Sequence, residues 1–208
     1  NQFYKFMNKI LINKRLLHKK PFFSVVTVVK NSDRYIEKTI RSVVSQSFKD
    51  FEYIVIDGNS TDLTLRRIKT FKNKINILIS EKDNGIYDAM NKGIKLSRGN
   101  VLVFINSGDT FTKKALQIIS QIFKKDKTID FVFGTVIRNY TKAKILKYGF
   151  NKNRLLYNFD FATSHTVGFF LKRKIYNLVG RFNTSYRCSA DYDIYLKVIM
   201  KRNLKGSS

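Results

Sequence analysis

Polar and acidic residues stand directly after several short apolar runs of this chain. Asp57 begins an Asp-Gly-Asn-Ser segment, Asp109 ends an Asn-Ser-Gly-Asp segment, and Asn31 opens Asn-Ser-Asp. Like charges placed together cost free energy unless a cation or hydrogen-bond donors offset them. A divalent metal that bridges a diphosphate would do this, because Mg²⁺ and Mn²⁺ favour carboxylate and phosphate oxygens. These segments therefore point to metal-assisted chemistry on a diphosphate compound.

The apolar runs before these segments are typical of buried strands. Residues 23–29 are largely β-branched, as expected for a strand covered on both faces. Further strands are predicted at 53–56, 75–79 and 101–105, and helices at 35–44, 65–71, 86–96 and 115–123. Strands that alternate with helices favour a parallel, doubly wound sheet. Ligands of such sheets bind beyond the carboxyl ends of the strands, where the polar segments stand.

The pattern changes after about residue 128. Irregular segments separate predicted strands at 131–136, 144–148 and 167–171, and a last helix is predicted at about 190–200. The chain ends soon after this helix, so we expect that a C-terminal segment is missing from the sequence.

The charge of the chain is strongly positive. Forty Lys and Arg face 15 Asp and Glu, a formal net charge of +25. Such a surface attracts nucleic acid, anionic lipid or phosphorylated substrates. Residues 1–21 alternate basic and apolar side chains, which predicts a basic amphipathic helix that lies on an anionic membrane or packs on its own domain.

Several function classes are disfavoured by what the sequence lacks. The segment after the first strand carries neither G-x-G-x-x-G nor G-x-x-x-x-G-K-[ST], which argues against a nicotinamide dehydrogenase and a P-loop enzyme. One Cys and two His exclude the common Cys/His zinc arrangements. A nucleic-acid-binding protein remains an alternative on charge alone, without a binding motif. A nucleotidyltransferase is a second alternative, but Lys30-Asn31-Ser32-Asp33 stands where it would carry a Gly/Lys-rich loop.

Motifs along residues 22 to 200 resemble the family 2 inverting glycosyltransferases, which have a GT-A fold. The similarity begins in 24–31 and 42–47, continues in 56–62, and is strongest in 80–93, Ser-Glu-Lys-Asp-Asn-Gly-Ile-Tyr-Asp-Ala-Met-Asn-Lys-Gly. The resemblance implies an α/β, Rossmann-like, mostly parallel sheet with flanking helices and a smaller acceptor-side region. On this basis we expect one domain over 22–208, with a nucleotide-binding part at about 22–127 and an acceptor-side part at about 128–208.

The same resemblance implies a donor site. Thr27 would lie at the base-binding rim, and Asp57 would accept a hydrogen bond from the uracil of a UDP-sugar. Donor contacts are also expected from Asn31 and Ser107, and from a segment that lines the ribose and the diphosphate, with Asp83, Asp88 and Asn91. His165 precedes a predicted strand and is a candidate contact to the diphosphate or the acceptor.

Asp109 stands where the family places its metal-binding D-x-D motif, and would hold Mg²⁺ or Mn²⁺. The chain departs from that motif, because Ser107 and Gly108 precede a lone carboxylate. One carboxylate with diphosphate and water still completes an octahedral site. Asp109 could instead cap the following helix.

Asp191 stands where the family places its catalytic base. Direct displacement at an anomeric carbon needs a base on the face opposite the leaving group, and one base without a covalent nucleophile gives inversion. Asp191 could also have only a structural role, in which its charge interacts favourably with the dipole of the helix that it opens. The resemblance implies transfer from a UDP-sugar to a saccharide or lipid-linked acceptor in bacterial surface-glycan synthesis. We expect the protein in the cytoplasm, at the inner face of the plasma membrane.

Overall fold

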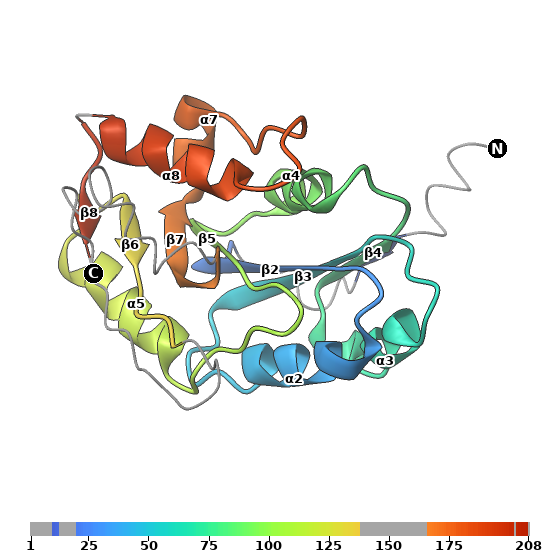
Figure 1. The fold of residues 1–208 in the computed structure, drawn as a ribbon. Coiled ribbons are helices and arrows are strands. Elements are labelled where there is room, and N and C mark those ends of the chain that lie inside the picture. Colours follow the sequence, from blue (N-terminus) through green and yellow to red (C-terminus); the bar gives the residue numbers. More distant parts are fainter. Residues whose placement is uncertain (1–9, 13–19, 138–165, 202, 208) are drawn as a thin grey trace.

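A computed structural model describes residues 10–12, 20–137, 166–201 and 203–207, and for 10–12 the backbone alone. Eight strands of this described part form one sheet (Figure 1). In spatial order they are β1 (Ile10–Ile12), β4 (Ile77–Ser80), β3 (Phe51–Asp57), β2 (Phe23–Val29), β5 (Val101–Phe104), β7 (Phe169–Lys172), β6 (Phe131–Phe133) and β8 (Gly206–Ser207).

The four strands at the centre, β4, β3, β2 and β5, are parallel to one another. The register pairs Val29 with Asp57, and Asp57 with Ser80, so that the carboxyl ends of β2, β3 and β4 are level. Loops that leave these strands therefore begin side by side. By contrast, β7 runs antiparallel to β5, and β6 antiparallel to β7.

Helices cover both faces of the sheet (Figure 1). One face carries α2 (Asp33–Val44), α3 (Thr64–Lys69) and α5 (Ala115–Lys125), and the other carries α4 (Ile86–Leu96), α7 (Tyr176–Val179) and α8 (Ala190–Met200). Short 3₁₀ turns are formed by Lys72–Lys74, Thr166–Gly168 and Arg173–Ile175.

Each face of the sheet has its own apolar core. Val26 and Val28 of β2 belong to the core that contains α4 and α8, whereas Val25 and Val29 belong to the core that contains α2 and α5. Because successive residues of a strand point to opposite faces, a strand that feeds two cores must be apolar at nearly every position. This explains the continuous apolar run of β2, which is buried throughout.

The predicted α/β architecture, a mostly parallel central sheet with flanking helices, is confirmed. One local prediction is wrong, because residues 10–12 form a strand where a helix was expected. β1 pairs with β4 and so satisfies backbone groups that an edge strand would leave exposed. The rest of the predicted N-terminal helix and the predicted strand at 144–148 lie outside the described residues. Within the described part, no helix is both long and apolar enough to cross a membrane.

Candidate functional site

Loops that follow β2 and β3 are joined by hydrogen bonds at the carboxyl edge of the sheet. Asn31 has a left-handed backbone (φ 47°), which Asn tolerates better than most residues. Its side-chain oxygen accepts the N–H of Thr61 at 2.8 Å, and its own N–H donates to Ser60 Oγ at 2.8 Å. Asn31 therefore lies at the predicted rim, as an exposed residue that ties two loops together.

Asp57, the last residue of β3, is fully buried. Its carboxylate accepts the Ser80 hydroxyl at 2.6 Å, and also the hydroxyl and the N–H of Ser60. Asp57 thus fastens the ends of β3 and β4 at the predicted rim. A hydrogen bond from the uracil of a donor would have to share carboxylate oxygens that already accept hydrogen bonds from Ser60 and Ser80.

Thr27 is not brought to the rim. It is fully buried inside β2, and its hydroxyl lies 2.9 Å from that of Tyr53 in the neighbouring strand. Burial raises the pKa of Tyr53 well above its ordinary value, so this phenol stays neutral. The structure therefore places Thr27 in the packing beneath the site, which corrects the expectation of a residue at the rim.

The loop after β4 approaches the rim at Gly58. A Cβ at Gly58 would meet the carboxylate of Asp83 and lie 3.3 Å from Cδ of Lys30. Asp83 accepts the N–H of Gly85 at 3.1 Å and is half-buried. Asp83 thus lies beside the ends of β2 and β3, together with a cation that could face a phosphate.

Asp88 and Asn91 on α4 have structural partners. Asp88 accepts the N–H of Asn84 at 3.0 Å and lies 3.5 Å from the Lys92 ammonium. Asn91 donates to the carbonyl of Phe182 at 2.9 Å and accepts its N–H at 3.0 Å. Because both amide atoms are used, Asn91 holds the segment before α8 against α4.

The loop after β5 carries the candidate metal ligand. Thr39 of α2 lies beneath it, accepts the Gly108 N–H at 3.0 Å and donates to the Asp109 carbonyl at 2.8 Å. Ser107 lies 2.8 Å, oxygen to oxygen, from Ser32 of the loop after β2. The half-buried Asp109 and Ser107 are therefore held beside the other strand ends.

The oxygen donors around Asp109 suit Mg²⁺ or Mn²⁺. The side-chain oxygen of Asn106 is buried without a hydrogen-bond partner, three residues before the Asp109 carboxylate. Hard divalent cations favour such oxygen ligands. No group of three or more His, Cys, Asp or Glu suited to a metal occurs in the described part of the chain. Most ligands of a metal here would therefore come from the substrate and water.

Asp191 lies in the first turn of α8, where a carboxylate is favoured by the helix dipole. Ser189 at the N-cap has a left-handed backbone (φ 67°), a strained conformation for Ser. The Tyr87 hydroxyl of α4 donates to Asp191 Oδ1 at 3.4 Å. Burial, and then the charge of Asp191, raise the pKa of Tyr87, so the phenol remains a neutral donor.

Tyr87 and Phe182 are residues that the sequence reasoning missed. Their rings stack at a centroid distance of 5.7 Å, and Asn91 fixes the backbone of Phe182. Tyr87 stands within the motif at 80–93, which could have drawn attention to it, whereas nothing in the sequence marks Phe182.

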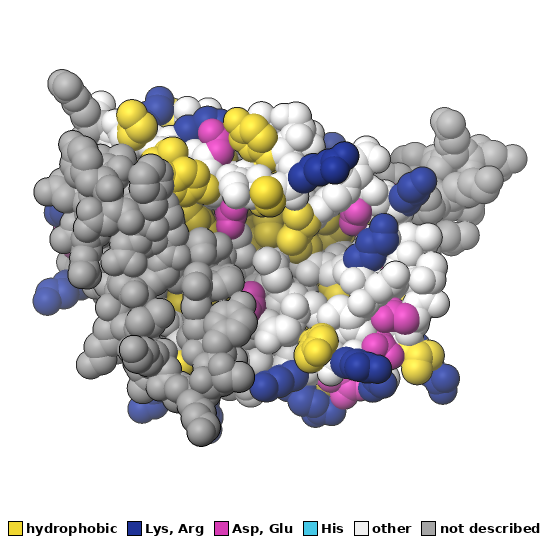
Figure 2. Space-filling model, in the orientation of Figure 1, with side chains coloured by type: hydrophobic (Ala, Val, Ile, Leu, Met, Phe, Trp, Pro, Cys, Tyr) yellow, Lys and Arg dark blue, Asp and Glu magenta, His cyan; other side chains and the backbone are white. Residues whose placement is uncertain are grey.

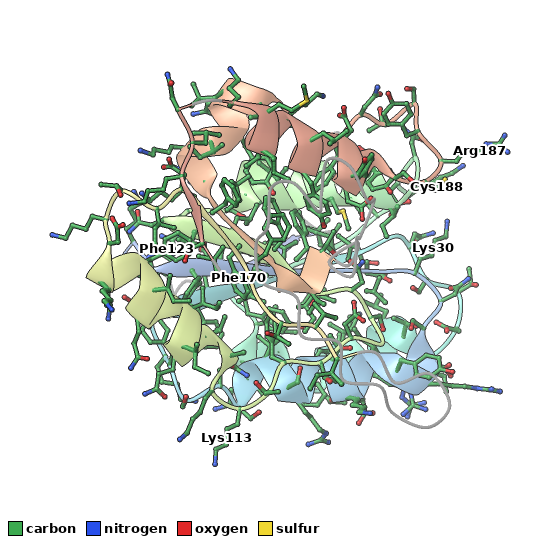
Figure 3. All side chains as sticks on the ribbon, turned by 60° about the vertical axis from the view of Figure 1, so that its left-hand side comes forward. Lys30, Lys113, Phe123, Phe170, Arg187 and Cys188 are labelled. Carbon is green, nitrogen blue, oxygen red and sulfur yellow. The ribbon has the colours of Figure 1, made fainter. Side chains whose placement is uncertain are left out.

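The candidate site has two sides, the loops at the strand ends and the helical layer of α4 and α8. Asp57, Asp83 and Asp109 lie at strand ends, and Asp191 lies in the helical layer with α4. In the space-filling view, acidic side chains border a recessed surface between α8 and α2 (Figure 2). Lys30, which directly follows β2, lies on the same side of the molecule as Arg187 and Cys188, which precede α8 (Figure 3). His165 lies outside the described residues.

Comparisons with known proteins identify relatives of this chain. The family model described as glycosyl transferase family 2 matches residues 24–193. A PGL/p-HBAD biosynthesis glycosyltransferase of Mycobacterium tuberculosis (strain ATCC 25618 / H37Rv) is 28% identical over 183 residues, which are 85% of this chain and 69% of that protein. Chondroitin synthase of Escherichia coli is 29% identical over 201 residues, 94% of this chain but 29% of that protein.

Solved structures share the fold. S. aureus TarS 1-349 in complex with UDP has a TM-score of 0.70 at 19% identity, over 89% of this chain and 56% of TarS. The mannosyltransferase PcManGT from Pyrobaculum calidifontis, in complex with GDP-Man and Mn2+, has a TM-score of 0.67 at 19% identity, over 98% of this chain and 61% of that one. The chain thus spans little more than half of these neighbours, and the expected GT-A fold is confirmed.

Proposed function

This chain belongs to glycosyl transferase family 2, and we propose that it transfers a sugar from UDP to a hydroxyl of a saccharide or lipid-linked acceptor, with inversion. The observation that carries the proposal is the contact of Asp191 with Tyr87, which stands in the first turn of α4, directly after the loop that carries Asp83. Structural neighbours bind UDP, UDP-GlcNAc and GDP-Man, which supports a nucleotide-sugar donor. The relatives that make polysaccharides support a role in surface-glycan synthesis.

Asp191 is the general base of the proposed reaction. Its carboxylate accepts the proton of the acceptor hydroxyl while that oxygen bonds to the anomeric carbon. The bond from this carbon to the diphosphate oxygen breaks on the opposite face, and UDP leaves with the electron pair. The neutral Tyr87 phenol holds the carboxylate in place, and no covalent sugar–protein intermediate forms.

Donor binding is assigned to the strand-end loops. Asn31, Asp83 and Ser107 lie at the rim, and Asp57 fastens the ends of β3 and β4. Asp88 holds the loop before α4 and Asn91 holds the segment before α8, so we assign both a positioning role. Asp109 would be the protein ligand for Mg²⁺ or Mn²⁺, and such a cation would neutralise charge on a departing diphosphate.

Calorimetry with UDP tests the donor site. We expect the wild type to bind UDP in the presence of Mn²⁺ and to bind it at least about tenfold more weakly with EDTA. Asp109→Ala should bind UDP equally weakly with and without Mn²⁺. Asp126→Ala is the matched control, because that carboxylate pairs with Lys205 at 2.7 Å in the connection from α5 to β6. UDP binding by Asp109→Ala that still responds to Mn²⁺ would remove Asp109 from the donor site.

We place the protein at the cytoplasmic face of the plasma membrane, as a peripheral protein. The net charge of +25 supports this, because anionic lipid attracts basic surfaces. The same attraction would serve an acceptor that carries a lipid-linked diphosphate.

A further inference from the structure

A groove of about 340 Å³ lies at the edge of the sheet where β2 and β5 begin. Half of its lining residues are cations, and none of the described lining residues is acidic. The cations are Lys20, Lys127, Lys172, Arg173 and Lys174. The groove therefore concentrates positive charge in a concave surface that the proposed transfer reaction does not use.

The backbone beneath these cations is held in place by hydrogen bonds. The segments before β2, at the start of β5 and after β7 form its floor. Asn100 N–H donates to the Pro21 carbonyl at 3.2 Å, and Arg173 N–H donates to the Asn100 carbonyl at 2.8 Å. The Lys172 ammonium also donates to the Lys127 carbonyl at 2.8 Å. The groove is thus formed before any ligand arrives.

The positive charge of the groove is only partly balanced. Asp130 lies 3.5 Å from the Lys172 ammonium and 4.0 Å from that of Lys174. This carboxylate thus lies near two of the five lining cations. A sixth, Lys124, lies over the ring of the lining residue Phe22 at 5.8 Å. Cations gathered in this way repel one another unless an anion binds among them.

Another concave surface, beside α2 and α3, shows that net charge alone does not produce this arrangement. Its lining includes Asp33 and Glu37 along with four cations. Glu37 lies 3.0 Å from Arg67 and 3.6 Å from Arg41. Acidic residues therefore offset the cations there, whereas the groove at the other edge has a lining without carboxylates.

The groove is separate from the donor site. It lies where β2 begins, and the donor site lies where β2 ends. At roughly 3.3 Å a residue, β2 spans about 20 Å. Phe123, which lines the groove, and Lys30, which follows β2, lie on opposite sides of the molecule (Figure 3). An anion in the groove is therefore not the diphosphate of the donor.

We propose that this groove binds a phosphate group, carried by an anionic phospholipid headgroup or by a soluble phosphate compound. Lys ammonium groups meet phosphate as point charges, and an Arg guanidinium can bind two of its oxygens. The half-exposed ring of Phe22 adds an apolar patch beside the cations.

The test compares two charge-matched variants of the full chain at physiological ionic strength, where the Debye length is about 8 Å. Arg173→Gln/Lys174→Gln removes two cations from the groove. Lys38→Gln/Lys69→Gln removes two exposed cations from α2 and α3, neither of which lines the groove. Binding is measured to inorganic phosphate by calorimetry, and by sedimentation to vesicles of phosphatidylglycerol with phosphatidylcholine, against phosphatidylcholine alone.

We expect the groove variant to lose about tenfold or more in binding, and the control variant to match the wild type, since each cation near an anionic surface adds measurably to affinity. Loss for inorganic phosphate identifies a soluble ligand. Loss for phosphatidylglycerol vesicles without binding of inorganic phosphate identifies a lipid headgroup. The proposal is overturned if the wild type binds neither probe, or if the two variants weaken equally. Neither result depends on sugar transfer.

Discussion

The phenolic oxygen of Tyr87 lies 3.4 Å from Oδ1 of Asp191, and this contact joins the first turn of α4 to the first turn of α8. α4 follows the loop that carries Asp83, so the contact connects the donor side of the site to the proposed base. The distance is long for an O–H···O bond.

Tyr87→Phe tests this contact while it keeps the ring that stacks on Phe182. A hydrogen bond to a carboxylate favours its charged form, so its loss should raise the pKa of Asp191. Because the charged form is the base, the acidic limb of the kcat–pH profile should move to higher pH. The carboxylate is also held less firmly, so kcat on the plateau of the profile should fall about 3- to 30-fold. UDP affinity should stay at the wild-type value. An unshifted acidic limb would show that Tyr87 only packs.

Asn91→Ala should weaken the packing of Phe182 against Tyr87. The change removes two hydrogen bonds to the backbone of Phe182, and this should lower the free energy of unfolding by about 1–3 kcal/mol. The stacked Tyr87 ring loses its support, so kcat should also fall. Denaturant unfolding and steady-state rates measure the two effects. In a double-mutant cycle with Tyr87→Phe, we expect the two losses of kcat to be less than additive. Full additivity would show that Asn91 acts independently of Tyr87.

Gly58→Ala should disturb the donor side alone. The new methyl group would meet the Asp83 carboxylate, so this side chain must leave its position beside Gly58. We expect a rise in KM for the donor of about tenfold, near 1.4 kcal/mol, with a smaller change in kcat. Gly134→Ala is the matched control, because its nearest neighbouring atoms lie at 3.6 Å or beyond, in ordinary contact. An unchanged donor KM for Gly58→Ala would mean that Asp83 does not contribute to donor binding.

Local patterns predicted the elements well, because their causes are local. The helical spacing of apolar residues in 86–96 and 190–200 predicted α4 and α8 with the bounds that the structure has. The parallel direction of β3 and β5 brought Asp57 and the loop of Asp109 to one edge, as strand-end reasoning requires. The antiparallel strand β1 was missed, because its three residues are too few to show a period.

The partners of the site residues could not be predicted from local patterns. Thr39 supports the Asp109 loop from 70 residues away, and Asn91 holds Phe182 from 91 residues away. Each looks in the sequence like an ordinary polar residue of an amphipathic helix. The predicted position of Thr27 was wrong for a related reason. A hydroxyl near the end of a strand can face the rim or a neighbouring strand. The hydroxyl of Thr27 faces the neighbouring strand, where it pairs with the hydroxyl of Tyr53.

The most direct test of the account is the effect of Asp191→Asn on donor binding and on sugar transfer, measured with the same preparation. Asparagine keeps the size and polarity of the side chain but cannot serve as the base. We predict UDP affinity within about twofold of the wild type and a loss of transfer of about 10²-fold or more. Transfer at the wild-type rate by Asp191→Asn would contradict the account, because the proton of the acceptor would then leave without this carboxylate.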